Sequence, residues 1–316
     1  MTERNSWADT DRKWALVDER KFMWHESQIS WLASVIGLTS GQTIADIGCG
    51  LGYLGWTYWE HYGAGGTYLG LDCSSSLIAD AVIEARSWSE GGNAAFINGD
   101  AYSIPLMDGS VDVAMCQTLL THLEYPEKAL REMIRITKPD GSVVCQELDN
   151  VSQFMKLSYS SVTDDEDIDE ILFYRKMRLI LARARKALGL GDLGIGSKIP
   201  RMMHEAGLTE IRGFCNERLE FLLPPYEEPE QNLRVEIMGR NDHDSTEEER
   251  HEAKEHFRER YLAGGGDSSS FDSDYERLMG IAETRRLNRQ AQLQAENLFS
   301  CSGGSNFFCI IGKKIY

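Results

Sequence analysis

The stretch from residue 44 to residue 55 reads IADIGCGLGYLG. Three alternating glycines, Gly48, Gly50 and Gly52, join a short apolar run to an aromatic-rich segment that starts at Tyr53. Glycine permits a tight turn and lets a ligand approach the backbone, while the N–H groups of a following helix face that ligand. The stretch therefore predicts a buried strand over residues 43–47, a ligand-binding turn, and a helix over residues 53–61.

The same alternation of short apolar runs and longer amphipathic segments continues through the first half of the chain. We expect the strands of this half at residues 43–47, 67–71, 94–97, 111–116 and 142–148, and its helices at 22–36, 53–61, 75–87 and 126–136. Such alternation is typical of βαβ units around a parallel sheet.

The second half of the chain loses this alternation. We expect helices at residues 164–188, at 199–206 and over most of 224–299, and strands at 208–222 and 306–311. The segment GGGDSSS at 264–270 predicts a flexible loop between helices. The simplest account is one parallel-sheet domain with two helical insertions.

Composition excludes several classes of partner. The chain has 316 residues and a formal net charge of −17, whereas binding of nucleic acid or an anionic membrane requires a basic face. The longest compact apolar stretch, residues 31–38, is too short to span a bilayer, and the N-terminus has no apolar run of the signal-peptide kind. The seven scattered cysteines have no metal-ligand spacing and are expected to be buried free thiols. We therefore expect a cytoplasmic protein without a bound metal, either a monomer or a homodimer.

The distribution of charge along the chain bears on the cofactor. Between Phe22 and Glu127 there are twelve acidic residues, and the only lysine or arginine is Arg86. NADP or coenzyme A is normally bound through arginine or lysine, so this stretch favours a cofactor that carries positive charge and no phosphate. Plain NAD is not excluded by charge, because its pyrophosphate can rest on a helix N-terminus alone.

Three aspartates follow consecutive predicted strands. Asp46 precedes the glycine turn, Asp72 ends the next strand, and Asp100 follows the third strand. A carboxylate in the position of Asp72 can accept both hydroxyls of a ribose, and Asp100 can meet an adenine amino group. Each aspartate taken alone can equally be a loop cap or a surface acid. The dinucleotide fingerprint G-x-G-x-x-G would place its third glycine at position 53, which is Tyr53, so the spacing disfavours NAD.

Taken together, these segments resemble the class I S-adenosylmethionine-dependent methyltransferases, specifically their UbiE-like small-molecule branch. The resemblance rests on four segments in the family's order: DIGCGLGYLG at 46–55, LGLDCSSSLIADA at 69–81, NGDAYSIPLMDGSVDVAMCQTLLTHL at 98–123, and LREMIRITKPDGSVVCQE at 130–147. It implies a Rossmann-like α/β fold with a seven-stranded, mostly parallel sheet, helices on both faces and an antiparallel last strand. Here the fold would carry helical insertions after strand 5 and before strand 7.

The resemblance also implies a division of the chain. We expect an N-terminal helical segment that can act as a lid (1–40), the cofactor-binding core (41–150), a first insertion (151–198), a continuation of the core (199–223), a second insertion that caps the substrate (224–303), and the last core strand (304–316). About eighty residues stand where the family usually has a tight hairpin between its last two strands.

Site residues follow from the matched motifs. The resemblance places S-adenosylmethionine against Asp46, Gly48, Cys49, Gly50, Gly52, Tyr53, Leu54, Asp72, Cys73, Asp100, Ala101 and Gln117. His122 lies where the family often has a residue near the transferred methyl group and can act as a general base, although a packing or capping role is about as probable. Trp24 and Glu147 are candidate acceptor contacts, with helix packing and turn capping as their respective alternatives. Aromatic residues Trp56, Tyr58, Trp59 and Tyr62 are expected to pack in the core.

The predicted function is methyl transfer from S-adenosylmethionine to a small-molecule acceptor, most readily through nitrogen or oxygen. One alternative is a non-catalytic relative that binds the cofactor and serves as a regulatory or assembly subunit. An NAD-dependent dehydrogenase is a second alternative, which the glycine spacing and the absence of a Tyr-x-x-x-Lys pair weaken. The acid excess favours a neutral or cationic acceptor over a phosphorylated one.

Overall fold

The computed structural model describes residue 24 and residues 26–88, 91–155, 159–216, 219–240, 247–302 and 307–316. The chain divides into two compact units. The sheet unit comprises residues 1–150, 190–217 and 305–316, and the helical unit comprises residues 151–189 and 218–304.

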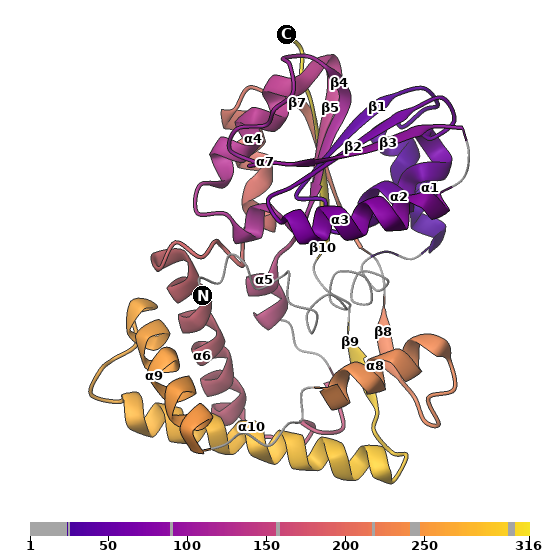
Figure 1. Cartoon of the computed structure of the whole chain (residues 1–316). Coiled ribbons are helices and arrows are strands. Elements are labelled where there is room, and N and C mark those ends of the chain that lie inside the picture. Colours follow the sequence, from indigo (N-terminus) through magenta and orange to yellow (C-terminus); the bar gives the residue numbers. More distant parts are fainter. Residues whose placement is uncertain are drawn as a thin grey trace. The chain divides into compact units, whose positions relative to one another are not determined.

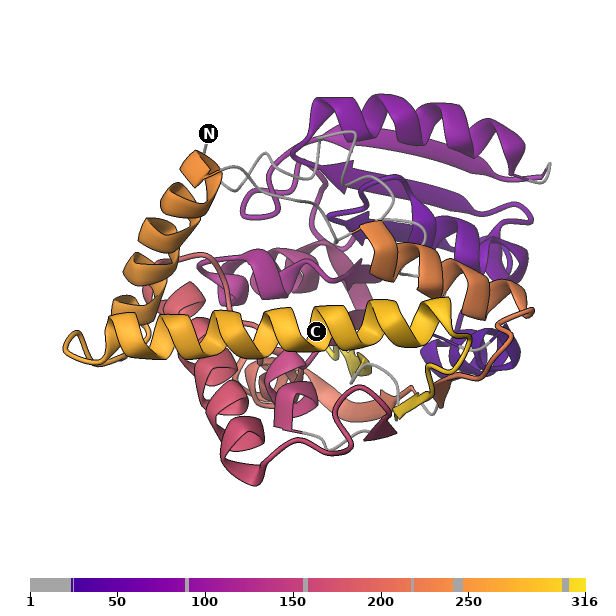
Figure 2. The ribbon, with the colours of Figure 1, turned by 90° about the horizontal axis from the view of Figure 1, so that it is seen from below.

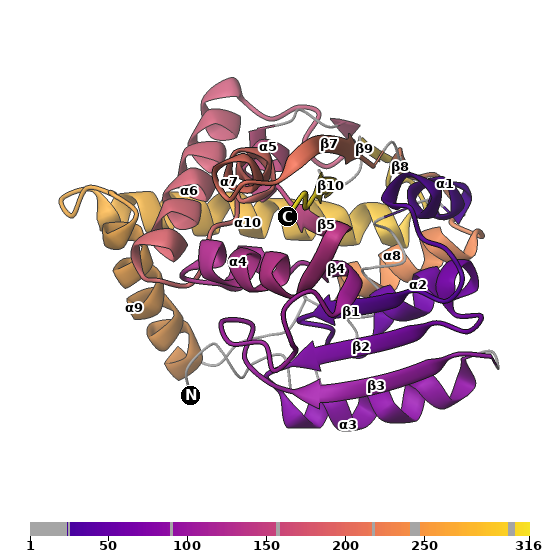
Figure 3. The same cartoon turned by 90° about the horizontal axis from the view of Figure 1, so that it is seen from above.

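The sheet unit is built on seven strands in the order β3-β2-β1-β4-β5-β10-β7 (Figures 1 and 3). The strands are β1 (Thr43–Ile47), β2 (Thr67–Asp72), β3 (Asn93–Asn98), β4 (Val111–Gln117), β5 (Thr137–Leu148), β7 (Thr209–Cys215) and β10 (Phe307–Lys313). Strands β1 to β5 pair in parallel, whereas β10 is antiparallel to both β5 and β7. The predicted fold class, a seven-stranded sheet with an antiparallel last strand, is confirmed.

Helices cover both faces of this sheet, as expected for strands that are buried on both sides. The helices are α1 (Glu26–Ile36), α2 (Tyr53–Tyr62), α3 (Ser75–Glu84), α4 (Pro126–Ile136) and α7 (Ile199–Glu205), with short 3₁₀ turns η4 (Ala85–Ser87), η5 (Leu120–His122) and η6 (Gly196–Lys198). Side chains of α4 and α7 pack in one hydrophobic cluster, and those of α1 and α2 pack in the other. The sheet therefore separates two cores.

Local sequence explains where several of these helices begin. Helix α3 starts after Ser74, whose hydroxyl accepts the backbone N–H of Leu77 at 3.4 Å. Helix α4 starts at Pro126, which has no N–H to leave unpaired. In α2, Tyr58, Trp59 and Tyr62 are buried as predicted, but Trp56 lies on the opposite side of the helix and is exposed.

The helical unit is held by a three-helix cluster and a small sheet. Its elements are α5 (Asn150–Met155, of which the first residue belongs to the sheet unit), β6 (Tyr159–Ser160), α6 (Ile168–Ala187), β8 (Glu220–Leu222), α8 (Pro229–Arg240), α9 (Glu247–Ala263), α10 (Phe271–Gln294) and β9 (Ser300–Ser302). Apolar side chains of α6, α9 and α10 form one core. The three short strands pair in the order β6-β9-β8. Figure 2 shows the length of α10 and its neighbours α6 and α9.

Two expectations differ from the structure. The single strand predicted over residues 208–222 is divided between β7 of the large sheet and β8 of the small one. Residues 264–266 form a close-packed turn rather than the predicted flexible loop, because a Cβ at Gly264 would lie 2.0 Å from the carbonyl oxygen of Ile180.

The predicted lid over residues 1–40 stays a prediction. Residues 1–23 lie outside the described part, and α1 is a helix, as expected, whose apolar side chains pack in the core.

All seven cysteines are free, as predicted, but not all are buried: Cys73 and Cys215 are exposed. No helix in the described part of the chain combines the length and the apolar character needed to cross a lipid bilayer.

Candidate active site

The glycine turn follows β1 and leads directly into α2. Its three glycines have φ angles of 72°, 54° and 79° at Gly48, Gly50 and Gly52, a region in which other residues are strained. The N–H groups of Gly48 and Cys49 donate to the carbonyl oxygen of Leu71 at 2.7 and 2.9 Å, which ties the turn to the end of β2. The turn is therefore held at the carboxyl edge of the sheet, between a strand and a helix as the sequence predicted.

Asp46 lies beneath this turn with a partner that sequence reasoning did not identify. The hydroxyl of Tyr68, on the neighbouring strand β2, donates to Asp46 Oδ2 at 2.7 Å, and Asp46 is only 1% exposed. Burial raises the pKa of Tyr68 well above its ordinary value of 10.0, and the charge of Asp46 adds to the rise, so the hydroxyl remains a donor. Gly55 leaves room for the ring, because a Cβ there would lie 2.3 Å from Tyr68.

Asp72 ends β2 and organises the two turns next to it. Its Oδ2 accepts the N–H of Gly50 at 2.9 Å, and its Oδ1 accepts the N–H of Ser74 at 2.8 Å. The backbone carbonyl of Asp72 accepts from Gly99 N at 3.0 Å and from Asn98 Nδ2 at 3.0 Å. Each carboxylate oxygen has two lone pairs. Asp72 can therefore hold the glycine turn and still accept the two hydroxyls of a ribose.

Asp100 and Ala101 lie in the loop that follows β3. Asp100 is exposed and its Oδ1 accepts the N–H of Tyr102 at 2.9 Å, while Ala101 is buried in the core beneath. The carboxyl ends of β1, β2 and β3 meet at one edge of the sheet, with Asp72 opposite Asn98. The three aspartates are thus brought to the same edge.

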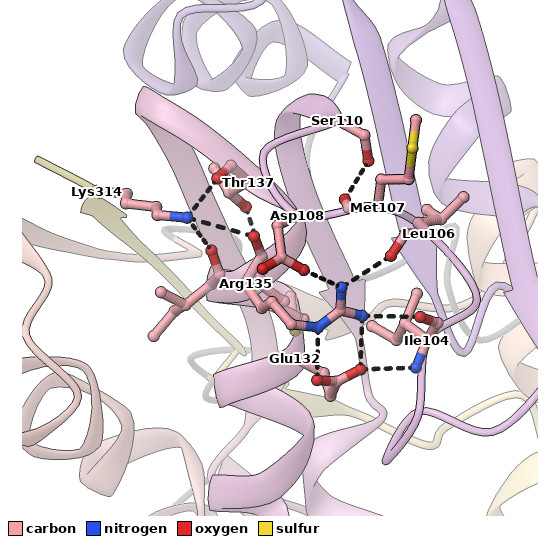
Figure 4. Close-up of polar contacts among 11 residues, drawn as sticks. Ile104, Leu106, Met107, Asp108, Ser110, Glu132, Arg135, Thr137 and Lys314 are labelled. Atoms are coloured by element: carbon pink, nitrogen blue, oxygen red, sulfur yellow. Dashed lines mark hydrogen bonds and ion pairs between the residues drawn. The ribbon is translucent and has the colours of Figure 1, made fainter. Parts of the chain in front are cut away.

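An arginine from α4 fastens the far part of this loop (Figure 4). The Arg135 guanidinium donates to the carbonyl oxygens of Ile104 and Leu106 at 2.8 Å each, and to Asp108 Oδ1 at 2.7 Å. Its remaining contacts, both at 2.8 Å, are to the two carboxylate oxygens of Glu132, whose Oε2 also accepts the N–H of Ile104. We call Arg135 and Glu132 the arginine clasp.

The arginine clasp was missed by the sequence reasoning, which treated residues 126–136 only as a helix. Lys314 similarly donates from Nζ to the carbonyl oxygens of Ile134 and Thr137 at 2.9 and 2.7 Å, and so satisfies the end of the same helix (Figure 4). The clasp and this lysine fix α4 to the loop and to the C-terminal strand.

The turn after β4 carries His122, which is exposed. Glu147, on β5, is fully buried beneath this turn and accepts the backbone N–H groups of Leu119 and Leu120 at 2.8 and 2.7 Å, and of Thr121 at 3.4 Å. These contacts favour an anchoring role for Glu147 over the acceptor contact predicted from sequence.

A returning segment supports the same turn from the other side. Thr121 Oγ1 donates to the carbonyl oxygen of Asp192 at 3.1 Å, and Asp192 N donates to the carbonyl oxygen of Thr121 at 3.1 Å. Gly191 allows this approach, because a Cβ there would lie 2.1 Å from the carbonyl oxygen of Thr121. Sequence reasoning assigned residues 151–198 to an insertion, and only the closely spaced Gly189 and Gly191 hinted at a turn.

The other predicted cofactor residues surround the glycine turn in different ways. Cys49 and Leu54 point into the core below it, and burial raises the pKa of the Cys49 thiol, with Asp46 and Asp72 adding to the rise. Tyr53 is half-buried at the first turn of α2, and Cys73 is exposed after β2. Gln117 ends β4 and is buried. All of these residues lie at the carboxyl edge, where a cofactor can reach backbone or side chain.

Trp24 lies outside this group, just before α1. It is 7% exposed, and its ring meets Phe307 of β10 edge to face with 5.4 Å between centroids. The packing of Trp24 on the end of the sheet is consistent with both roles considered from the sequence, helix packing and contact with the acceptor.

The charge at the carboxyl edge depends on where Arg86 lies, because Arg86 is the only lysine or arginine between Phe22 and Glu127. Arg86 comes after α3, which starts at the carboxyl end of β2 and runs back along the sheet for about 15 Å at 1.5 Å per residue. Arg86 therefore lies near the opposite edge of the sheet. The carboxylates at the carboxyl edge can attract a ligand that carries a sulfonium and an ammonium, and the backbone N–H groups of the glycine turn can donate to such a ligand's polar oxygens.

Comparison with known proteins agrees with this geometry. Residues 45–145 match the family model described as a methyltransferase domain. An uncharacterized methyltransferase of Schizosaccharomyces pombe is 34% identical over 115 residues, which are 34% of this chain and 41% of that protein. A demethylmenaquinone methyltransferase of Lactococcus lactis is 29% identical over 143 residues, which are 44% of this chain and 54% of that protein.

The chain thus spans about half the length of the curated relatives it matches. Among solved structures, the YcgJ protein of Bacillus subtilis superposes with a TM-score of 0.50 at 16% identity, over 92% of this chain and 100% of that one. That likeness supports the fold. The domain at residues 45–145 is thus similar to methyltransferase domains, in agreement with the class I S-adenosylmethionine-dependent methyltransferases that the motifs predicted.

Proposed function

We propose that this chain transfers the methyl group of S-adenosylmethionine to a small-molecule acceptor, through a nitrogen or oxygen atom of that acceptor. One observation carries the proposal. Asp46, Asp72 and Asp100 lie at the carboxyl ends of three adjacent parallel strands around the glycine turn, in a stretch whose single arginine lies near the other edge. Coulomb attraction favours a positively charged ligand there and disfavours a phosphorylated one.

Each residue of the edge has a role in holding the cofactor. Asp72 accepts the ribose hydroxyls with the lone pairs that its two backbone contacts leave available. Asp100 accepts from the adenine amino group and Ala101 packs against the ring. The backbone of Gly48, Gly50 and Gly52 approaches the methionine part, where Gln117 adds a polar contact.

The chemistry requires orientation more than activation. The bound cofactor supplies an electrophilic methyl group on a sulfonium, and the protein's contribution is to align an acceptor nucleophile with it and to exclude water. His122 projects from a turn that Glu147 and Asp192 hold from two sides. As a neutral imidazole it can take the proton that the acceptor loses.

Calorimetry with S-adenosylmethionine and with NAD tests the cofactor assignment. We expect the protein to bind the former and not the latter. Asp72→Asn should weaken binding about ten- to a hundredfold, because hydrogen bonds to a charged group contribute about 1.5–3 kcal/mol.

Asp112→Asn is the matched control. Asp112 also accepts a backbone N–H, that of Thr43 at 2.8 Å, but at the amino edge of the sheet. Its replacement should leave the affinity for S-adenosylmethionine unchanged. Equal binding of NAD, or equal effects of the two substitutions, would refute the cofactor assignment.

A screen with methyl-labelled S-adenosylmethionine against pools of small metabolites tests methyl transfer itself. With any acceptor so found, His122→Ala should lower turnover while S-adenosylmethionine binds as before. Cofactor binding without transfer to any pool would instead favour the non-catalytic alternative.

A further inference from the structure

Gln146 is a fully buried polar residue that the site described above does not use. It lies on β5, directly before Glu147, and is paired with Gln117 of β4 and Cys309 of β10. Successive side chains of a strand point to opposite faces. Glu147 faces the turn that carries His122, so Gln146 faces α1 and α2 instead.

Only one end of the Gln146 amide is satisfied by the chain. Its Nε2 donates to the hydroxyl of Tyr58 at 2.9 Å and also lies against the thiol of Cys309. Its Oε1 is buried and has no hydrogen-bond partner among the described residues.

Trp24 has the complementary deficit in the same region. Its indole Nε1, a donor, is buried without a hydrogen-bond partner in the described part of the chain. The Trp24 ring packs on Phe307, which lies opposite Leu148 and is two residues from Cys309 on β10. One buried acceptor and one buried donor thus lie over the same end of the β5–β10 pair.

We propose that Gln146 Oε1 and Trp24 Nε1 bind an uncharged hydroxyl or carboxamide group of the methyl acceptor, an assignment that rests on the proposed function. Buried polar groups in native proteins are almost always paired, so a buried donor and a buried acceptor without partners call for an explanation, and a bound ligand group supplies one. A hydroxyl or a carboxamide donates to Gln146 and accepts from Trp24 at once. The proposed site lies at the carboxyl end of β5, because Gln146 is paired with Gln117, the last residue of β4, and its backbone carbonyl oxygen accepts the N–H of Thr118 at 2.8 Å.

The surroundings exclude charged groups from this position. Burial raises the pKa of both Tyr58 and Cys309, so these neighbours stay neutral and cannot balance a charge. A carboxylate or phosphate has no proton to donate to Gln146 Oε1, and an ammonium cannot accept from the indole of Trp24. An unpaired buried charge carries a large desolvation penalty.

Pairs of probe compounds that share the methylated atom and differ in the neighbouring group test the assignment. Nicotinamide, salicylamide and catechol provide the uncharged group, and nicotinate, salicylate and catechol monophosphate replace it with an anion. With labelled S-adenosylmethionine and the full chain, we expect kcat/KM at least tenfold higher for the uncharged member of a pair. Gln146→Leu and Trp24→Phe should bring this ratio toward one, with the affinity for S-adenosylmethionine changed less than twofold.

Gln42→Leu is the matched control, because Gln42 makes its hydrogen bonds to residues 37 and 39, ahead of β1 at the amino edge of the sheet. It should leave the ratio unchanged. If Gln146→Leu does not fold, Gln146→Met and Trp24→Phe give the same readout.

Three results would overturn the assignment while S-adenosylmethionine still binds. They are an anionic member preferred over its partner, a ratio that persists in the Gln146 and Trp24 variants, and no methylation of any uncharged member. Failure of the wild-type protein to bind S-adenosylmethionine would instead refute the proposed function on which the assignment rests.

Discussion

Each of the two units contains a glycine-rich turn, and glycine has a different role in each. Gly48, Gly50 and Gly52 in the sheet unit all have positive φ angles and lead from β1 into α2, next to the Asp72 carboxylate of the predicted cofactor site. In the helical unit, glycine instead allows close packing where α9 ends. A Cβ at Gly264 would lie 2.0 Å from the Ile180 carbonyl oxygen, and one at Gly266 would lie 2.3 Å from the Tyr261 ring. Glycine thus supplies backbone conformation in the first turn and space in the second.

Charged residues show the same contrast. In the helical unit, Arg285 donates to both carboxylate oxygens of Glu166 at 2.5 Å and lies 4.0 Å from the centroid of the Tyr174 ring. These contacts join α10 to α6 and to the segment before it. At the edge of the sheet unit, Asp72 and Asp100 accept from backbone N–H groups, and within the described part of the chain neither has an arginine contact of this kind. Charge in the helical unit therefore holds helices together, whereas at the sheet edge the carboxylates hold the turns of the predicted cofactor site.

The largest expected effect on stability is in the glycine turn of the helical unit, at residues 264–266. Gly266→Ala would force a methyl group into the Tyr261 ring, and overpacking of this kind costs about 1–3 kcal/mol. We expect a lower urea midpoint and faster proteolysis between α9 and α10. The affinity for S-adenosylmethionine should change less, because the cofactor residues belong to the sheet unit.

Gly280→Ala provides the control within α10, where a Cβ would meet no atom within 4 Å. Alanine should stabilise this helix by up to about 1 kcal/mol through helix propensity. Equal destabilisation by both substitutions would contradict the view that the turn at 264–266 is close-packed.

A comparable effect on stability is expected at the arginine clasp. Arg135→Met removes the donors to the carbonyl oxygens of Ile104 and Leu106 and should cost about 1–3 kcal/mol. Because the clasped loop continues from Asp100 and Ala101, we also expect weaker binding of S-adenosylmethionine, measured by calorimetry. Arg135→Lys should recover only part of both losses, since lysine lacks the planar fork. Unchanged affinity in Arg135→Met would separate the clasp from the adenine site.

The sheet unit could be predicted from the sequence to a large extent. The bounds of β1 and α4 coincide with the predicted ones, because glycine breaks and Pro126 mark them locally. The strand-end aspartates followed from topology, since parallel strands bring their carboxyl ends to one edge. Each of these inferences needs only local pattern and strand order.

Contacts between distant segments could not be predicted. Glu147 looked like an acceptor contact, but its partners are the N–H groups of residues 119–121, and only packing brings them together. Tyr68 beneath Asp46 and Gly191 against Thr121 depend on the same kind of approach. The strands β6, β8 and β9 have two or three residues each, which is too short for an alternation of apolar and polar residues to show in the sequence.

The smallest expected effect is on the stability of the protein at acid pH. It compares one ion pair from each unit. Hydrogen bonds from Arg135 lower the pKa of Glu132 below its ordinary value of 4.5, and Arg286 lowers that of Glu283 in the same way. A carboxyl whose pKa is lower in the folded state stabilises that state above its unfolded pKa, and the gain is lost as the pH falls toward the folded value. Both pairs are spaced i,i+3, but the Glu132 side chain is 21% exposed and that of Glu283 is 53% exposed.

Urea midpoints between pH 6 and pH 3 should therefore fall less steeply in Glu132→Gln than in the wild-type protein. Glu283→Gln should change the slope little, because a solvent-exposed ion pair contributes little to stability and is screened by salt. Equal slopes in both variants would show that the arginine clasp is no stronger than a surface pair, in which case the loop after Asp100 would owe its position to the burial of Ala101 and Ile104 instead.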